Sequence, residues 1–124
     1  MKQCPETPAL DAVTELSGHV WVQELPTGGE FRFQVAASGL VTFATAQRTF
    51  ETAVSVPLQF RRAAECITER LDRDALQAAT DDPGDVTFCG IATRNESVEY
   101  DWRAVPPFVG VDVWSGRNDQ FLSP

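Results

Sequence analysis

The chain has 124 residues, of which 43% are hydrophobic, and this length and composition suit one domain with its own core. The mean hydropathy of −0.19, with no apolar run of about 20 residues, argues against a membrane-spanning protein. Eighteen acidic residues against ten basic ones give a formal net charge of −8.

The basic residues are unusual in kind, because nine of the ten are arginine and Lys2 is the single lysine. An acidic surface poor in lysine is typical of proteins adapted to high salt, where ions screen the self-repulsion of carboxylates. An ordinary acidic protein would explain the net charge but not the preference for arginine. The composition argues against a lysine-rich nucleic-acid-binding face and against a mechanism that needs a lysine inside the fold.

The cysteines, Cys4, Cys66 and Cys89, are odd in number and scattered, with no CxxC pair. This pattern indicates reduced thiols and not a disulfide framework. Together with the absence of a signal-peptide pattern in the first residues, this cysteine pattern predicts a cytoplasmic protein. A zinc site would need all three cysteines and His19 from distant segments, so we expect no metal site.

The first half of the chain has the pattern of an antiparallel meander over residues 18–43, preceded by a lead-in segment at 1–17. Alternation of apolar and polar residues predicts strands at 19–24, 30–35 and 40–43. The proline and two glycines of residues 25–29 (LPTGG) predict a loop.

Alternation in the second of these strands places Phe31, Phe33 and Val35 on one face. Arg32 lies between these core positions, so in the absence of a ligand we expect it on the surface of the strand.

One main helix is expected next, with Pro57 as its first residue. Apolar residues recur at helical spacing at Phe60, Ala64, Ile67 and Leu71. The arginines between them are expected to form a solvated face. Asp72 is placed to cap a continuation over 73–79, which the DDPG sequence at 81–84 ends.

The last third of the chain predicts a buried strand at 86–91 and a β-rich segment at 108–114, with Glu99 and Asp101 on one side of a further strand. The element order indicates an α+β fold with a mostly antiparallel sheet and one main helix.

Common catalytic motifs are missing from the sequence. It has no P-loop, no GxGxxG and no GxSxG nucleophile elbow. Asp81, Asp82 and Asp85 lack the spacing of a calcium loop and predict a solvated acidic turn. The residues by themselves therefore point to an acidic α+β domain without an evident reaction.

Four stretches, LDRDAL (71–76), DDPGDVTFCG (81–90), YDW (100–102) and PPFVGVDVWS (106–115), resemble the RNA ligase-like branch of the covalent nucleotidyltransferases, especially the short ligase-like proteins of halophilic archaea. The resemblance covers residue 19 to the end. It implies a partial nucleotidyltransferase (adenylation-domain) fold over 18–124, shortened at its C-terminus. It also implies ATP, Mg²⁺ and ATP-dependent joining of RNA ends.

In that family a lysine in a Lys-x-Asp-Gly motif attacks the α-phosphate of ATP and forms a lysyl–AMP adduct. When the chain is aligned with this motif, Leu25 stands in place of the lysine and Thr27 in place of the aspartate. Leucine has no nucleophile, so we expect no covalent adenylation. The family's far-wall lysines and second glutamate have no counterpart before residue 124.

Other positions do match the family pattern. The resemblance implies six nucleotide-binding residues, Glu24, Gly28, Arg32, Arg48, Phe108 and Asp112. Glu24 would line the base pocket, Arg48 would meet phosphate and Phe108 would stack on adenine. Where the family has Gly-Glu on a central strand, this chain has Gly90 and Ile91. Whether or not a nucleotide binds, five apolar residues are expected in the core: Phe31, Phe33, Phe108, Val111 and Trp114.

These observations predict that the chain is a catalytically inactive RNA ligase-like domain, which at most binds an adenine nucleotide or an RNA end weakly. An acidic protein-interaction module without nucleotide chemistry is the alternative, and survival of the family reaction with unconventional residues is a third hypothesis. A shortened sheet would leave an edge or apolar face exposed, which favours self-association.

Overall fold

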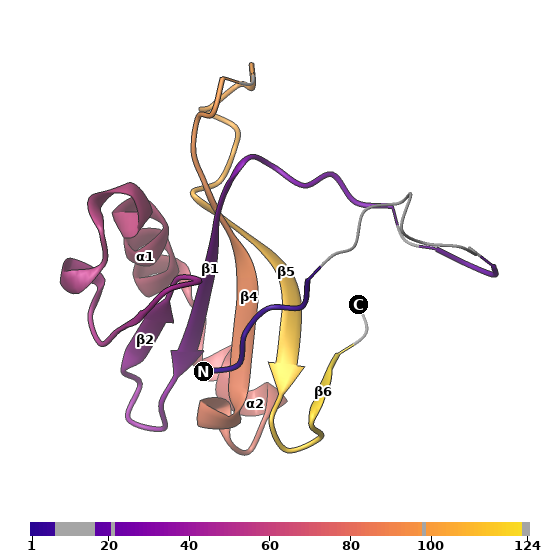
Figure 1. Ribbon diagram of the computed structural model, residues 1–124. Helices are drawn as coiled ribbons and strands as arrows, with labels where there is room; N and C mark the ends of the chain where they lie inside the picture. Colours follow the sequence, from indigo (N-terminus) through magenta and orange to yellow (C-terminus); the bar gives the residue numbers. More distant parts are fainter. Residues whose placement is uncertain (7–16, 21, 98, 123–124) are drawn as a thin grey trace.

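A computed structural model of the chain describes residues 1–6, 17–20, 22–97 and 99–122. Most of the expected lead-in segment, at 7–16, therefore lies outside the described residues, as does Trp21. One antiparallel sheet of six strands, ordered β3-β2-β1-β4-β5-β6, forms the centre of the molecule (Figure 1). The strands are β1 (Gly28–Val35), β2 (Val41–Ala44), β3 (Thr49–Phe50), β4 (Val86–Thr93), β5 (Phe108–Ser115) and β6 (Gln120–Phe121). The helices are α1 (Leu58–Arg70) and α2 (Arg73–Ala79), with 3-10 turns at Ala53–Ser55 and Pro83–Asp85.

The α+β class and the antiparallel sheet are confirmed. β1 and β2 form the expected hairpin, in which Gly39 takes a φ of +85°, a conformation that favours glycine. α1 begins at Leu58, one residue later than predicted, and Pro57 is its N-cap. Asp72 caps α2 as expected, since its Oδ1 accepts a hydrogen bond from the Ala75 backbone N–H at 2.9 Å.

Three local predictions were wrong. The described residues of 19–24 form no strand, because both edges of β1 are already paired, with β2 and with β4. Gly28 and Gly29 belong to β1 and not to the preceding loop. The segment containing Glu99 and Asp101 is a turn, and Ala104 N–H donates to the Asp101 carbonyl at 2.8 Å.

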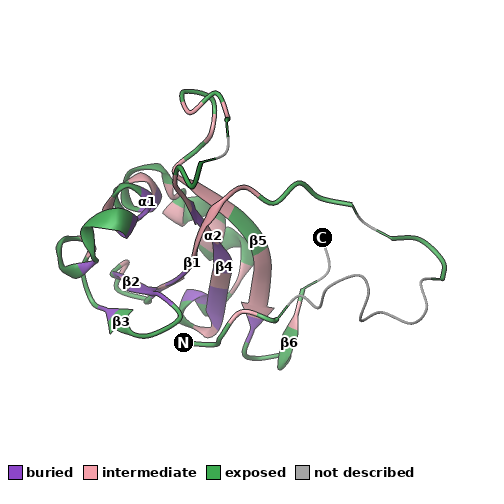
Figure 2. Ribbon diagram, turned by 45° about the horizontal axis from the view of Figure 1, so that its top comes forward, coloured by how far each residue is buried: buried purple, intermediate pink, exposed green. Residues whose placement is uncertain are grey.

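The core lies between one face of the sheet and the helices (Figure 2). Phe31 is fully buried, and its ring stacks between Phe43, at 5.7 Å, and Phe60 of α1, at 5.5 Å. Phe33 and Val35 continue the same face, as the alternation predicted. These contacts fix α1 against β1 and β2.

The opposite face of the sheet is covered in part by the N-terminal segment, residues 1–6, which crosses in front of β4 in Figure 1. The Lys2 carbonyl accepts a hydrogen bond from Arg32 of β1 at 2.7 Å, and Lys2 Nζ lies 3.9 Å from the ring centroid of Trp114 of β5. This segment buries what would otherwise be an exposed polar face.

A register shift between Cys89 and Gly90 on β4 bends the pairing with β5. Cys89 pairs with Asp112 and Gly90 with Gly110, so Val111 is the extra residue of the bulge and is 38% exposed. The expectation that Val111 belongs to the core was therefore wrong. Phe108 packs partly buried against the core, while Trp114 contacts Lys2 and Phe121.

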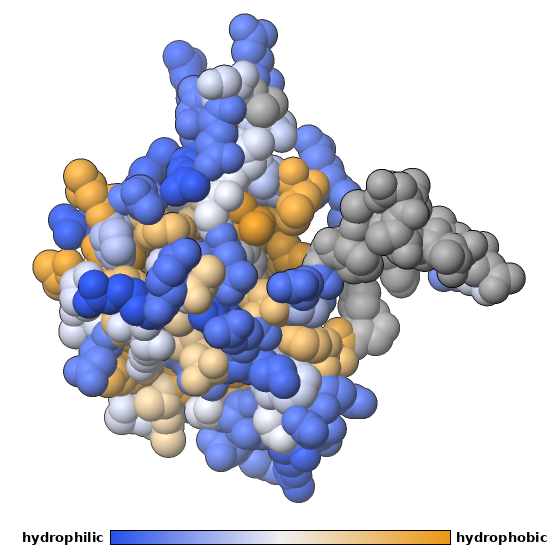
Figure 3. All heavy atoms as spheres, in the orientation of Figure 1, coloured by the Kyte–Doolittle hydropathy of each residue, from blue (hydrophilic) through white to orange (hydrophobic). Residues whose placement is uncertain are grey.

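Within the described residues, the two edge strands, β3 and β6, have two residues each. Such short edges offer few free backbone groups for pairing with another chain. No helix in the described part of the chain is long and apolar enough to cross a membrane. Hydrophilic side chains cover much of the face seen in Figure 3, with smaller hydrophobic patches between them.

Candidate functional site

A hollow of about 480 Å³ beside β4 and β5 brings together two of the residues that the resemblance singled out. Three phenylalanine rings from three strands line it, those of Phe33, Phe88 and Phe108. Phe33 stacks on Phe88 with centroids 4.6 Å apart and meets Phe108 edge-on at 5.7 Å. Asp112 also contributes to the lining, but its carboxylate lies on the opposite face of the sheet, beside Cys89, because strand residues alternate between the two faces. The aromatic wall suits the flat face of a planar group, and the volume is within the range of small-ligand sites.

The position of the Phe108 ring depends on Gly90, the residue opposite Gly110. A Cβ at Gly90 would clash with the Phe108 ring and with the carbonyl oxygen of Val109. Gly28, the other glycine matched to the family motif, is likewise pressed against the carbonyl of Ala92. Packing alone therefore explains both glycines, whether or not a nucleotide binds.

Arg32, Cys89 and Asp112 form one row across three neighbouring strands, because Arg32 pairs with Cys89 and Cys89 with Asp112. Directly opposed residues on antiparallel strands lie about 4.5 to 5.5 Å apart. A guanidinium, a thiol and a carboxylate are thus neighbours on the face that the N-terminal segment covers. This row lies on the face of the sheet opposite the rings of Phe33 and Phe88.

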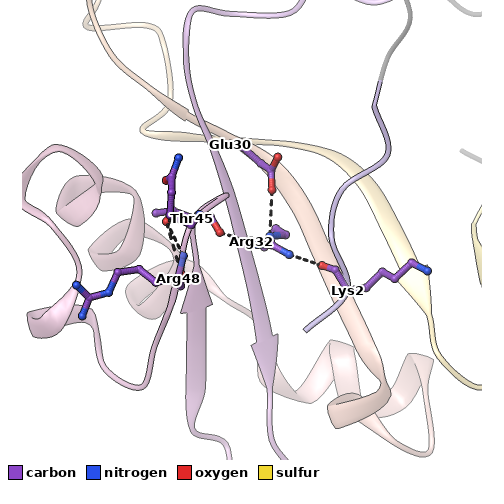
Figure 4. A network of polar contacts seen from close by, with 6 residues as sticks. Lys2, Glu30, Arg32, Thr45 and Arg48 are labelled. Carbon is purple, nitrogen blue, oxygen red and sulfur yellow. Dashed lines mark hydrogen bonds and ion pairs between the residues drawn. The ribbon is translucent and has the colours of Figure 1, made fainter.

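Arg32 is 4% exposed, so the expectation that it is a surface residue was wrong. Its guanidinium donates from Nη1 to the Lys2 carbonyl at 2.7 Å and from Nη2 to the Thr45 carbonyl at 2.5 Å (Figure 4). The Glu30 carboxylate lies 3.1 Å from Nε, off the N–H direction, as an ion pair without hydrogen-bond geometry. Arg32 therefore binds the N-terminal segment and the β2–β3 turn to β1, and these contacts leave it little capacity for a ligand phosphate.

Cys4 of the N-terminal segment and Cys89 of β4 are in hydrogen-bonding contact. The Cys4 thiol holds the pKa of Cys89 below its usual value, and the Arg32 guanidinium acts in the same direction. Burial and the Asp112 carboxylate oppose this shift. The hydrogen bond to Cys89 and burial raise the pKa of Cys4. Cys89 is therefore the thiol that ionises first.

Mild oxidation with hydrogen peroxide is expected to join Cys4 to Cys89. The Cys89 thiolate attacks one peroxide oxygen and becomes a sulfenic acid, releasing hydroxide that takes up a proton to give water. The Cys4 thiol then attacks that sulfur, and a second water leaves as the disulfide forms. Intact mass spectrometry under denaturing, non-reducing conditions should show the loss of two hydrogen atoms. Cys66→Ser should behave like the original chain, while the same product from Cys4→Ser would contradict the pairing.

The remaining sequence-predicted residues lie elsewhere. Glu24 is exposed in an extended segment, and Leu25, at the position of the family's nucleophile, is 58% exposed. Arg48 lies in the turn between β2 and β3, where its backbone pairs with Thr45 and its guanidinium lies 5.0 Å from the Phe50 ring centroid. In Figure 4 the Arg48 side chain points away from Arg32. Phe108 and Asp112 thus both line the hollow, whereas Arg32 lies on the opposite face of the sheet from Phe108, and Glu24 and Arg48 lie elsewhere.

The Mg²⁺ that the family implies finds no suitable donor set among the described residues. No three histidine, cysteine, aspartate or glutamate side chains gather there in a way that could hold a metal ion. Mg²⁺ prefers several oxygen ligands in octahedral geometry. The residues present do not fit this ion, and we derive no reaction step through it.

Two features of the structure were missed from the sequence. The first is the docking of residues 1–6, for which the sequence has no periodic signal. The second is a pocket between α1 and the β4–β5 connection, lined by Arg61, Arg62, Arg94 and Trp102. The sequence predicts only a solvated face for the arginines of α1, because nothing in it places Trp102 beside them.

Comparison with known proteins gives no relative to set beside this geometry: no family model matches the chain, and no curated protein or solved structure matches it significantly.

Proposed function

We propose that this chain is a non-catalytic relative of the RNA ligase-like nucleotidyltransferases that binds an adenine nucleotide weakly in the aromatic hollow. The supporting observation is that Phe108 and Asp112, matched to the family on sequence, line one hollow with Phe33 and Phe88. The proposal includes a partial adenylation-domain fold, with which the antiparallel sheet agrees. The adenine would lie against the phenylalanine rings.

Loss of catalysis follows from the absence of a nucleophile. Leu25 precedes β1, whose first residue, Gly28, pairs with Thr93 at the end of β4. Lys2 contacts Trp114, which pairs with Thr87 at the start of β4. Six residues of extended strand separate Thr87 from Thr93, about 20 Å at 3.3 Å per residue. Lys2 is therefore too far away to replace the missing lysine.

Weak binding is expected because few polar groups converge on the hollow. Arg32 is engaged with backbone carbonyls, and Glu24 and Arg48 lie apart from it. Most of the affinity would come from contact with the base, so adenosine should bind nearly as well as ATP.

Titration with adenosine, followed by amide chemical shifts in concentrated KCl, tests this proposal. We expect shift changes confined to the hollow, and about tenfold weaker binding in Phe108→Ala, since stacking of one base contributes roughly 1 to 3 kcal/mol. Phe121→Ala is the matched control, because Phe121 packs on Trp114 and does not line the hollow. Equal affinity of both variants, or no shift change at millimolar adenosine, would overturn the proposal.

Incubation with α-labelled ATP and Mg²⁺ separates binding from catalysis. No acid-stable labelled protein should form, and a labelled band would show that an unconventional nucleophile has replaced the lysine.

The alternative function, an acidic protein-interaction module, is supported by the segment that precedes β1. Val20, Val22 and Leu25 are 57%, 92% and 58% exposed, respectively. An extended segment with free apolar side chains can add to a partner's surface. Failure of adenosine to bind would favour this function.

A further inference from the structure

A second pocket, of about 440 Å³, lies between the first turns of α1 and the connection from β4 to β5. Arg61 and Arg62 enter it from the helix, and Arg94 and Trp102 from the connection. Residue 94 is held in place by the segment before β1, since Thr27 Oγ1 donates to its carbonyl at 3.0 Å and its N–H donates to the Thr27 carbonyl at 3.1 Å. The pocket is separate from the aromatic hollow, with which it shares no lining residue.

The charge of this pocket is opposite to that of the protein. The chain has a formal net charge of −8, yet the pocket lining contains three arginines and one carboxylate, Glu65, for a sum of +2. Bringing guanidinium groups together is unfavourable unless anions compensate them. The first turn of α1 contains no acidic residue, so the helix end adds to the positive potential.

The N–H donors of Arg61, Arg62 and Arg94 are only partly occupied by hydrogen bonds and ion pairs with other described residues. Arg61 donates from Nη2 to the Val54 carbonyl at 3.2 Å, and its buried Nε has no hydrogen-bond partner there. Arg62 forms no ion pair with any described residue, while Arg94 pairs through Nε with Glu96 at 2.7 Å. Unused, directional N–H donors on guanidinium groups that line one pocket suit the oxygens of a phosphate.

Trp102 supplies a second recognition element. It is half-buried on the pocket wall, and its ring meets Tyr100 edge-on at 5.3 Å, which fixes its orientation. An indole face next to arginines is suited to a planar base, because stacking and phosphate contacts act together. The volume lies within the range of small-ligand sites.

We propose that this pocket binds a phosphate monoester joined to a planar group, as in a nucleoside monophosphate, with the phosphate on the arginines and the base against Trp102. The inference is independent of the proposed function. It requires phosphate, whereas the aromatic hollow is expected to bind adenosine without it.

Titration of the whole chain with inorganic phosphate and with AMP at low salt tests this site, with amide and indole N–H chemical shifts as the readout. Phosphate should shift amides at 58–62 and 93–95, and AMP should also shift the Trp102 indole. The double variant R61Q/R62Q should bind both ligands about tenfold more weakly or worse, a change of about 1.4 kcal/mol or more. R70Q/R117Q changes the net charge equally at exposed positions outside the pocket and should bind like the original chain.

Equal weakening in R61Q/R62Q and R70Q/R117Q would mean non-specific attraction and would overturn the proposal, as would shifts that map elsewhere. Trp102→Ala distinguishes the two halves of the ligand, because AMP should lose affinity while inorganic phosphate does not. Unchanged AMP affinity in Trp102→Ala would refute the stacking. Adenosine binding weakened about tenfold by Phe108→Ala, with phosphate binding intact, would place the two ligands at separate sites.

Discussion

Replacing Arg32 with methionine is expected to lower the free energy of unfolding by about 3 kcal/mol, although no ligand contact is removed. Methionine fills much of the same volume but cannot donate to the carbonyls of Lys2 and Thr45, which Arg32 contacts at 2.7 and 2.5 Å. Hydrogen bonds from a charged donor contribute roughly 1.5 kcal/mol each or more, and buried carbonyls left unpaired add to the loss. Urea unfolding in concentrated KCl measures the change.

Arg48→Met is the matched control, since it removes the same charge from an exposed side chain whose described contact is the Phe50 ring. Its effect should stay within about 0.5 kcal/mol. In Arg32→Met, the amide chemical shifts of residues 2–4 should also change, because the hydrogen bond from Arg32 to the Lys2 carbonyl is lost. Equal stability of the two variants would show that the contacts of Arg32 contribute nothing.

Truncating Phe31 to alanine is expected to cost about 4 kcal/mol of folding free energy, a larger loss than that from Arg32→Met. Phe31 is fully buried and stacks with Phe43 on β2 and with Phe60 on α1. Alanine would leave a cavity bounded by two strands and a helix, which cannot close without moving α1. Thermal and urea unfolding should both report this loss.

Leu40→Ala removes an apolar side chain that is 54% exposed beside the same hairpin and should change stability by no more than about 0.5 kcal/mol. Phe31→Leu should fall between the two, because leucine fills part of the cavity. If Phe31→Ala were no worse than Leu40→Ala, the stacked rings would not be the centre of the core.

The sequence was sufficient where periodicity and capping act locally. Apolar spacing and Asp72 predicted α1 and α2 almost to the residue, and alternation placed Phe31 and Phe33 on the core face. It failed where the outcome depends on what lies next to a segment. Residues 19–24 alternate like a strand but form none in their described part, because both edges of the following strand, β1, are paired with β2 and β4. β3 and β6 are too short to produce a pattern.

Site residues were predictable to a similar degree. Phe108 and Asp112 stand close together on one strand, so both line the hollow, but the bulge at Val111 turns the Asp112 side chain to the other face of the sheet. The burial of Arg32 depends on residues 1–6, which approach from the far end of the chain. Likewise, Trp102 meets Arg61 and Arg62 only because a long connection bends back to α1. Contacts of this kind have no signature in a single sequence.

Docking of residues 1–6 also sets an order of events during synthesis. Lys2 and Cys4 leave the ribosome well before Cys89 and Trp114, the partners they contact in the folded protein. Until Cys89 and Trp114 have been synthesised, residues 1–6 have no binding site on the sheet and are expected to stay unstructured. Closing the large loop between residues 1–6 and these partners is slow compared with forming the β1–β2 hairpin. Residues 1–6 are made before every strand of the sheet, yet they are expected to dock among the last, and until then Arg32 and the Cys89 thiol remain open to solvent.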